Sequence, residues 1–591
     1  MKMDSKKFNL IFLLILVLQI VTMCLFGIQK AGYHQDEYYS YFSTNRSLGF
    51  YYPDREWVDT DTLKNEFEVL KGEGFNYGLV HLVQSWDVHP PLFYDFLHTV
   101  CSLTPGVFSK WQGLLVNLIA FVISYLLLNA LAKSVGMNRG LRLILMFSYG
   151  FNPMTISCVM FIRMYMWLTV FVLSLALCHM RLISLIKNYY AGSELTGFKL
   201  AKPFDKRFKK GFAKCVINIA AVSFLGFMTQ YYFLIFMVMI GLSFVIWFLF
   251  LMPKNRKKSN AASGVDEDQK QLTIEGILND EQFVAQAASM AERFMYIVFY
   301  GIGCAVSLGC AVLVYPASLS HIFRGYRGQE AQAAFADGSN ILERLGFFYG
   351  LARDYLFAGF DWLIIILVVI ALIGLFFLIR IKGEKDKLHI AHIRILAATA
   401  AGYFIVVAKT ALLLGETSNR YEMPIYPIML LLAVYFVRIG MRAIVGNRKA
   451  FGIVIPYFLT FLVFALITAK GLLADHNVLF LYPEDRARIS YAKEVKEQGI
   501  PVVVMFNEKT PDNIWRLTDE LLEYDKLYYI SEDNTADIAD AEIKNADEII
   551  VYAADHENRD VLMGKIEALN QNYQACDVLY TKEMWTVYKI K

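Results

Sequence analysis

Long uninterrupted apolar runs recur along most of the sequence. The first, from Asn9 to Ile28, holds 20 residues without a charge, which form a helix of about 30 Å and can cross a bilayer. Ten further apolar segments follow, over roughly 111–132, 143–160, 162–186, 215–232, 233–252, 294–315, 356–379, 394–414, 425–440 and 451–472. This pattern predicts an all-α polytopic membrane protein with about eleven transmembrane helices.

One shorter apolar stretch, from Pro91 to Leu103, is expected to lie at the membrane surface or to re-enter the same face. Its 13 residues are too few to cross a bilayer. Counting it as a span would also put the basic stretches 133–142 and 187–214 on opposite faces. Because basic loops collect on the cytoplasmic side, we expect both stretches to lie inside and Pro91–Leu103 not to cross.

Basic residues between the spans set the predicted orientation. With eleven spans and a cytoplasmic N-terminus, every basic cluster falls on the cytoplasmic side. The clusters are Lys2 with Lys6 and Lys7, then 133–142, 187–214, 254–258, 380–387 and 438–449. The outer face then holds a long first loop (29–110), turns near Ile162 and Gln230, the loops 316–355 and 415–424, and the C-terminal tail. We therefore expect a multi-pass protein of the plasma membrane.

The C-terminal residues 475–591 differ from the rest of the chain in charge and pattern. They carry 24 acidic and 13 basic residues, a net charge of −11, whereas the remainder has a net charge of +14. Short β-type runs (Val502–Phe506, Leu527–Ile530, Ile549–Ala553, Trp585–Lys589) alternate with helical stretches (Asp512–Glu523, Arg559–Asn570). This alternation predicts a small α/β domain. The predicted domains are thus a transmembrane part, 1–474, and an extracytoplasmic domain, 475–591.

The composition supports this class and excludes several others. Hydrophobic residues make up 56% and charged residues 19% of the 591 residues, and the mean hydropathy is +0.41. These values exclude intrinsic disorder, a coiled coil and a disulfide scaffold. The basic excess lies in short blocks between apolar helices, so it reflects membrane topology rather than nucleic-acid binding. The eight cysteines have neither a disulfide framework nor a metal-binding spacing.

Two groups of acidic and histidine residues lie in the first loop. The segment His34-Gln35-Asp36-Glu37 follows the first span, and Asp87-Val88-His89-Pro90-Pro91 precedes the short interfacial helix. Adjacent carboxylates so close to hydrocarbon are costly when they are buried and unpaired, which makes the first group a candidate site. The alternatives are a solvated loop in an interfacial aromatic belt and a capped helix start with an incidental histidine.

Cations are predicted at the outer ends of later helices. Arg163 begins an apolar helix, Lys409 lies about 9 Å inside the outer edge, and Arg420 follows in the loop 415–424. The loop after the seventh span adds His321, Arg324 and Arg327. A snorkelling lysine and solvated surface charges are the alternatives to a ligand site. Carboxylates together with guanidinium and ammonium groups at a membrane surface suit a reaction on a lipid-linked phosphate.

These segments resemble those of the GT-C glycosyltransferases that use polyprenyl-phosphate sugars, especially the protein O-mannosyltransferases and the bacterial aminoarabinose transferase-like group. Asp36-Glu37 is similar to the family's acidic pair, and Asp87-Val88-His89-Pro90-Pro91-Leu92 is similar to its second first-loop motif, which is the most specific match. Further resemblances are Arg163-Met164-Tyr165, Arg420-Tyr421 with Pro424 and Pro427, and more weakly Phe227–Tyr232, with Gln230 where a histidine is common. The resemblance covers about residues 8–440.

The resemblance implies roles for individual residues. Asp36 would be the general base, with Glu37 in support. The donor phosphate would be neutralised by Arg163, Lys409 and Arg420, and the pocket would be shaped by Asp87, His89, Tyr165, Tyr421 and Arg324. The implied reaction is one in-line displacement with inversion at the anomeric carbon, which needs a base but no covalent carboxylate intermediate.

The implied partners are a polyprenyl-phosphate-linked sugar, membrane lipid and an acceptor hydroxyl on a protein, a glycolipid or a polysaccharide. No cofactor follows from the sequence, and a divalent metal stays open because metal dependence varies in such families. A transporter or flippase also stays open, although inverted repeats and charges at the membrane midplane would then be expected. Further alternatives are a non-catalytic cell-envelope assembly protein and an oligosaccharide ligase or oligosaccharyltransferase that uses a diphosphate donor.

Overall fold

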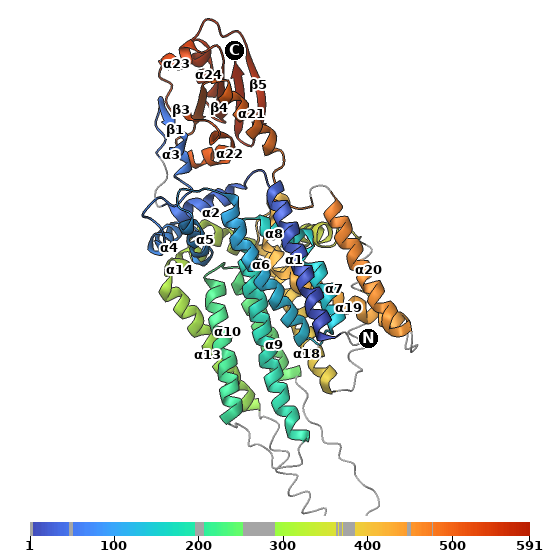
Figure 1. Cartoon of the computed structure of the whole chain (residues 1–591). Helices are drawn as coiled ribbons and strands as arrows, with labels where there is room; N and C mark the ends of the chain where they lie inside the picture. Colours follow the sequence, from blue (N-terminus) through green and yellow to red (C-terminus); the bar gives the residue numbers. More distant parts are fainter. Residues whose placement is uncertain are drawn as a thin grey trace, which may run out of the picture.

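The computed structural model describes residues 4–46, 51–195, 206–251, 290–337, 339–361, 364–365, 369, 384–445, 451–474 and 477–591. Helices form most of this part, and residues 477–591, called the tail from here on, contain most of a single sheet. The tail stands on one end of the helical part, next to helix α2 (Gln35–Asn45) (Figure 1). We call this the tail end of the helical part.

Long helices build the part of the chain before the tail. They are α1 (Ser5–Gln29), α6 (Lys110–Ser134), α7 (Arg139–Gly150), α8 (Pro153–Met160), α9 (Tyr165–Leu195), α10 (Lys206–Phe227), α11 (Phe233–Ile246) with the π-helical η1 (Trp247–Leu251), α13 (Met290–Val314), α18 (Glu384–Thr410), α19 (Tyr426–Val445) and α20 (Phe451–Leu473). Shorter elements connect them: α3 (Thr60–Lys64), α4 (Tyr77–Trp86), α5 (Leu92–Leu103), α14 (Ala317–Phe323), α15 (Tyr326–Ala336), α16 (Ile341–Leu351), η2 (Ala352–Leu356), η3 (Gly415–Tyr421) and η4 (Met423–Ile425).

Nine helices of the described part are long and apolar enough to cross a membrane, and α7 with α8 adds a tenth if this pair, bent by 50°, counts as one span. The predicted segment 356–379 lies mostly outside the described residues. Helix α5 has 12 residues and is about 18 Å long, too short to cross a bilayer, as expected. The predicted fold class, a helical multi-span protein with a small C-terminal α/β domain, is confirmed.

The bend between α7 and α8 follows from the local sequence. Pro153 has no N–H to continue α7, and proline disfavours helical backbone at the residue before it. Asn152 starts the new helix instead, because its side chain accepts a hydrogen bond from the backbone N–H of Met154 at 3.0 Å. A second break, between Met160 and Tyr165, separates α8 from α9 and contains Arg163.

The sheet has six strands in the order β1-β3-β2-β4-β6-β5. The strands β2 (Val502–Phe506), β3 (Lys526–Ser531) and β4 (Ile549–Ala554) are parallel, and β6 (Trp585–Ile590) and β5 (Cys576–Lys582) extend it antiparallel. Around it lie α21 (Asp485–Glu497), η5 (Pro511–Leu517), α22 (Thr518–Leu521), α23 (Ala541–Asn545) and α24 (Arg559–Glu567). Four strands coincide with the predicted runs, whereas β5, most of whose residues are exposed, was not predicted.

The remaining strand comes from the first loop. Strand β1 (Glu56–Asp59) pairs antiparallel with β3, with Glu56 opposite Tyr529 and Asp59 opposite Lys526. Four residues of mixed polarity carry no usable periodicity, so this strand was not predicted. The first loop and the tail therefore share one sheet (Figure 1), and they meet at the same end of the helical part.

Candidate active site

A cavity of about 850 Å³ lies at the tail end of the helical part. Its polar wall is built by α2, the segment 87–89, the break between α8 and α9, and η3. Seven of the ten residues predicted from the sequence line it: Asp36, Asp87, His89, Arg163, Tyr165, Arg420 and Tyr421. The fold thus brings together side chains such as those of Asp36 and Arg420, which are 384 positions apart in the sequence.

The first acidic motif forms the start of α2. The His34 side chain accepts a hydrogen bond from the Asp36 N–H at 3.0 Å, and the Glu37 carboxylate accepts one from the His34 N–H at 2.6 Å. This reciprocal capping box satisfies two backbone donors that a helix start leaves free. It also fixes Asp36 in the first turn, where the positive end of the helix dipole favours a carboxylate.

Glu37 is part of the internal framework and does not line the cavity. It is fully buried, and its carboxylate accepts a hydrogen bond from the Ile162 N–H at 2.7 Å and pairs with the Lys30 ammonium at 2.9 Å. Lys30 is fully buried as well, and it also donates to the Phe480 carbonyl at 2.7 Å. Glu37 therefore ties the end of α1, the start of α2 and the α8–α9 break together.

Removing this carboxylate is expected to destabilise the protein strongly. In a Glu37→Ala variant the Lys30 ammonium stays buried without its counter-ion, which costs about 3–5 kcal/mol of unfolding free energy. The matched control is Glu542→Ala in the tail, because Glu542 pairs with Lys526 where both side chains are nearly half exposed, and such pairs contribute about 0–1 kcal/mol. Thermal unfolding in detergent measures both variants, and equal shifts in Tm would contradict the framework role of Glu37.

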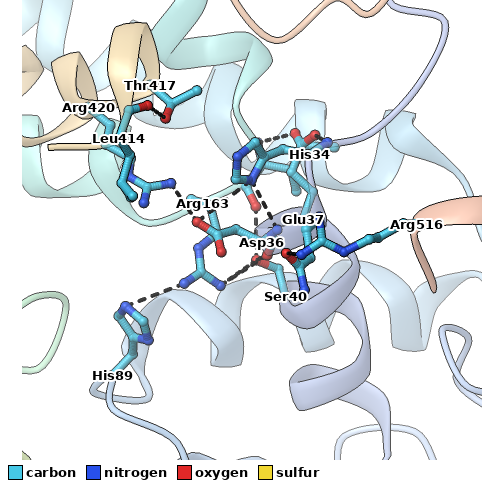
Figure 2. A network of polar contacts seen from close by, with 12 residues as sticks. His34, Asp36, Glu37, Ser40, His89, Arg163, Leu414, Thr417, Arg420 and Arg516 are labelled. Atoms are coloured by element: carbon cyan, nitrogen blue, oxygen red, sulfur yellow. Dashed lines mark hydrogen bonds and ion pairs between the residues drawn. The ribbon is translucent and has the colours of Figure 1, made fainter. Parts of the chain in front are cut away.

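Asp36 faces two arginines (Figure 2). Its Oδ2 accepts a hydrogen bond from Arg420 Nη1 at 2.5 Å, and its backbone carbonyl accepts one from Arg163 Nη1 at 3.1 Å. Burial alone would raise the pKa of the Asp36 carboxyl, but the charges of Arg163 and Arg420 outweigh burial and hold the pKa well below its usual range. Asp36 is therefore ionised at neutral pH.

A second chain of contacts links Arg163 to the other first-loop motif. Arg163 Nη2 lies 3.3 Å from His89 Nε2, and His89 Nδ1 lies 3.0 Å from the Asp87 carboxylate (Figure 2 shows the Arg163–His89 contact). Burial lowers the pKa of His89 below its usual value, despite the opposing charge of Asp87. A neutral imidazole that donates from Nδ1 to Asp87 leaves Nε2 free to accept from Arg163. Asp87 and His89 thus hold Arg163 in place.

Both guanidinium groups are buried and incompletely hydrogen bonded. Arg163 and Arg420 are 4% and 5% exposed, and the Nε–H of each meets no partner among the described residues. The Nη2 of Arg420 has only a 3.5 Å contact with the Tyr421 hydroxyl. Buried donors without partners are costly, and they indicate a site that takes an acceptor-rich, anionic ligand. Three arginines and two aspartates line the cavity, so its lining carries a positive excess.

Another part of the lining is aromatic and apolar. It includes Leu234, Ile235, Val406, Leu412 and Phe335, together with Tyr231 and Tyr232 from the turn between α10 and α11. The Tyr232 ring lies 5.2 Å from that of Tyr421, which in turn lies 6.1 Å from Tyr165. The cavity therefore combines a cationic, carboxylate-bearing wall with a wall suited to hydrocarbon.

Besides Glu37, two predicted residues are absent from the cavity lining, Lys409 and Arg324. The Lys409 ammonium donates to the Asp337 carbonyl and to Asn340 Oδ1, the latter at 2.7 Å, so its charge holds the chain before α16 against α18. Arg324 is the C-cap residue of α14, and its backbone N–H donates a hydrogen bond to the Ser320 carbonyl. Arg327, three residues further, lines the cavity instead.

Sequence reasoning missed several lining residues. Gln35 and Tyr39 belong to the cavity together with Asp36, and their helical spacing from Asp36 was the available signal. His321, a candidate from the sequence together with Arg324 and Arg327, also lines the cavity, and its Nδ1 lies 2.9 Å from the Tyr231 hydroxyl. This contact links α14 to the turn after α10, which no local pattern indicates.

The described residues do not fit a divalent metal. No group of three or more His, Cys, Asp or Glu side chains in this part of the chain is arranged to hold a metal ion. The two carboxylates of the cavity are already engaged by Arg420 and His89, whereas Mg²⁺ and Ca²⁺ need free oxygen ligands.

No protein-family model and no curated protein matches the sequence. Among solved structures, the chain is similar to ArnT from Cupriavidus metallidurans in the apo state, with 10% identity, a TM-score of 0.45 and 97% of each chain covered. It is also similar to the oligosaccharyltransferase of Archaeoglobus fulgidus in the apo form, with 11% identity and a TM-score of 0.43, covering 92% of this chain and 69% of that one.

A third similar structure is AglB from Archaeoglobus fulgidus, an oligosaccharyltransferase in complex with an inhibitory peptide and a dolichol-phosphate. Its identity to this chain is 10% and its TM-score is 0.39, with 87% of this chain and 64% of that chain covered. At these TM-scores the likenesses assign neither a substrate nor an activity to this chain, so both have to follow from the geometry of the cavity.

Proposed function

We propose that this protein is an integral membrane glycosyltransferase that moves a sugar from a polyprenyl-phosphate donor to an acceptor hydroxyl, with inversion at the anomeric carbon. The observation that carries the proposal is the pair of buried, incompletely bonded guanidinium groups beside Asp36. Arginine binds phosphate through two parallel hydrogen bonds. Neither an ATP site nor an activated nucleotide is needed, because the donor ester already carries its leaving group.

The reaction balances with one base. The acceptor hydroxyl oxygen attacks the anomeric carbon from the face opposite the phosphate, and the bond between that carbon and the phosphate oxygen breaks. The electron pair stays on the lipid phosphate, where Arg163 and Arg420 stabilise the developing charge. The hydroxyl proton passes to the Asp36 carboxylate. A single displacement inverts the configuration and forms no covalent enzyme intermediate.

Donor binding should also raise the pKa of the Asp36 carboxyl. In the free protein, Arg163 and Arg420 hold its pKa low, which makes it a weak proton acceptor. A phosphate bound to the same two guanidinium groups offsets their charge and raises the pKa of Asp36 towards its usual range. The carboxylate thus becomes a better base when the donor is present.

The apolar wall suits the lipid part of the donor. Leu234 and Ile235 on α11, with Val406 on α18 and Leu412 just beyond it, line the same cavity as the arginines. Phosphate at the arginines and isoprene units along this wall would place the sugar beside Asp36. A transporter is less well supported, because the charged groups gather at one end of the helical part rather than along a path through it.

Native mass spectrometry of the purified protein tests the phosphate site. We expect the wild type to bind a polyprenyl monophosphate and not the polyprenyl alcohol of the same length, and an Arg163→Ala/Arg420→Ala variant to lose the phosphate preference. Equal binding of the alcohol and the phosphate would overturn the assignment. A non-catalytic assembly protein has no reason to discriminate between the two lipids.

The proposal includes the orientation in which the N-terminus is cytoplasmic and the cavity and tail lie on the outer face of the plasma membrane. Cys576, exposed on the edge strand β5, offers a test. A membrane-impermeant maleimide applied to intact cells is expected to label the wild type, and Cys576→Ser should remove this label. Labelling of Cys576 that needs permeabilised cells would reverse the orientation.

A further inference from the structure

Helix α2 has two faces that carry different contacts. Asp36 and Ser40, four residues apart, face the arginines, since Ser40 Oγ accepts a hydrogen bond from Arg163 Nη1 at 3.2 Å. Gln35, Tyr39 and Phe42, spaced four and three residues apart, contact the tail, and Gln35 and Tyr39 also border the cavity. Residues at this spacing share one side of a helix. The contacts of α2 with the tail therefore run alongside Asp36 without involving its carboxylate.

The tail contacts this second face through η5. Arg516 Nη2 donates a hydrogen bond to Gln35 Oε1, and the Tyr39 hydroxyl donates one to the Asp512 carboxylate. The ring of Trp515, between these two residues, packs against Tyr39 and Phe42 at centroid distances of 5.0 and 4.7 Å. Figure 2 shows Arg516 reaching α2 from the tail side.

The tail is itself held on the first loop at independent points. Trp515 Nε1 donates to Glu66 at 2.5 Å, and Arg516 forms an ion pair with Glu583 of the sheet hairpin. Strand β1 of the first loop belongs to the sheet. The element η5 is therefore fixed from both sides, and it can transmit the position of the sheet to α2.

We propose that Asp512 and Arg516 are positioning residues that set the rotation of α2 about its axis and thereby the direction of the Asp36 carboxylate. This inference rests on the proposed function. A carboxylate about 6 Å from the helix axis moves by about 1 Å when the helix turns by about 10°, and a misplacement of about 1 Å costs about 100-fold in rate. The tail is thus a working part of the active site.

The kinetic test separates positioning from donor binding. The hydrogen bonds of Arg163 and Arg420 described above run to residues outside the tail. Arg516→Ala is therefore expected to lower kcat about 10–100-fold while polyprenyl-monophosphate affinity stays within about twofold. Arg516→Lys keeps a donor for Gln35 and is expected to restore part of kcat. The matched control is Arg559→Ala, because Arg559 lies in the same tail, forms an ion pair with Asp555 and is similarly shielded. An equal loss of kcat and donor affinity in Arg516→Ala would overturn the proposal.

Hydrogen–deuterium exchange provides a readout that does not depend on activity. In Arg516→Ala, the amides of α2 are expected to exchange faster than in the wild type, whereas Arg559→Ala leaves α2 unchanged. In a Gln35→Ala/Arg516→Ala double variant, the amides of α2 should exchange no faster than in Arg516→Ala alone, because the two substitutions remove the same contact. Unchanged exchange in α2 would overturn positioning even in an active enzyme. If the wild type transfers no sugar, the proposed function fails, and the exchange data still decide whether the tail fixes α2.

Discussion

Asp36→Asn is expected to lower kcat for sugar transfer by about 10²–10⁴-fold, the usual contribution of a general base. Asparagine has nearly the same shape, and its carbonyl oxygen can still accept the hydrogen bond that Arg420 Nη1 donates to Asp36. The arginines thus keep their places, and the lost property is the ability to take a proton. With one negative charge fewer in the cavity, donor affinity should be unchanged or higher.

The comparison with a neighbouring carboxylate makes this test specific. Asp61 lies in the same first loop but is exposed, so Asp61→Asn should retain wild-type kcat. Steady-state kinetics at saturating donor, with lipid-monophosphate binding measured separately, distinguishes loss of the base from loss of the donor. Turnover of Asp36→Asn within about threefold of the wild type would remove Asp36 from the proton-transfer step.

Arg420→Ala is expected to raise the donor KM by about 10–100-fold, because a hydrogen bond to a charged group contributes about 1.5–3 kcal/mol. Arg420 also stabilises the leaving phosphate, so kcat should fall as well. Arg420→Lys is expected to recover only part of the affinity, since lysine offers a point charge and not a planar fork. A donor KM unchanged in Arg420→Ala, measured beside Arg559→Ala, would contradict a phosphate site at η3.

Arg420→Ala is also expected to shift the pH dependence of kcat/KM in a defined direction. In the wild type the pKa of Asp36 is depressed by Arg163 and Arg420, so the carboxylate stays ionised until the pH falls well below 4, the usual value for aspartate being about 3.9. Loss of Arg420 removes one of these charges and raises the pKa. The acid limb of kcat/KM should therefore move to higher pH in Arg420→Ala. The stability that the Asp36–Arg420 pair contributes is present above the unfolded pKa and disappears as the pH falls through the folded pKa.

Much of the site could be predicted from the positions of unusual polar residues relative to the predicted spans. Asp36, Arg163 and Arg420 each stand just beyond or just before an apolar segment, and parity of the spans puts all three at one face. Helices that cross a membrane have few degrees of freedom, so side chains at their ends meet side chains at the ends of their neighbours. The structure brings these three residues within hydrogen-bonding distance.

The sequence did not show how each helix is rotated about its axis, and so which side chains face the cavity. Glu37 follows Asp36 directly, and successive helical residues point about 100° apart, so one carboxylate faces the cavity and the other pairs with Lys30 in the interior. Lys409 lies on a side of α18 that meets Asn340. The role of Arg327 in the cavity lining depends on the packing of α14 and α15, which carries no local signal.

The tail was underestimated for a different reason. Its strands β2, β3 and β4 are buried and read as apolar runs, so its class was predictable. Its docking depends on a four-residue strand from the first loop and on single side chains such as Arg516 and Asp512. Such non-local pairings have no periodicity. Sequence alone therefore suggested an appended module, whereas the structure joins the tail to the helix that carries Asp36.

In the proposed function, the cavity with Arg163, Arg420 and Asp36 transfers a sugar from a lipid phosphate. The most direct test incubates the purified protein, in lipid nanodiscs, with the total lipid extract and envelope fraction of its own cells, and follows polyprenyl phosphates by mass spectrometry. We expect the wild type to convert a polyprenyl-phosphate sugar into free polyprenyl phosphate and a glycosylated acceptor, and Asp36→Asn not to do so. A folded wild type that leaves every polyprenyl-phosphate sugar intact would contradict sugar transfer by this cavity, and consumption of the donor by Asp36→Asn at the wild-type rate would contradict the role of Asp36 as the base.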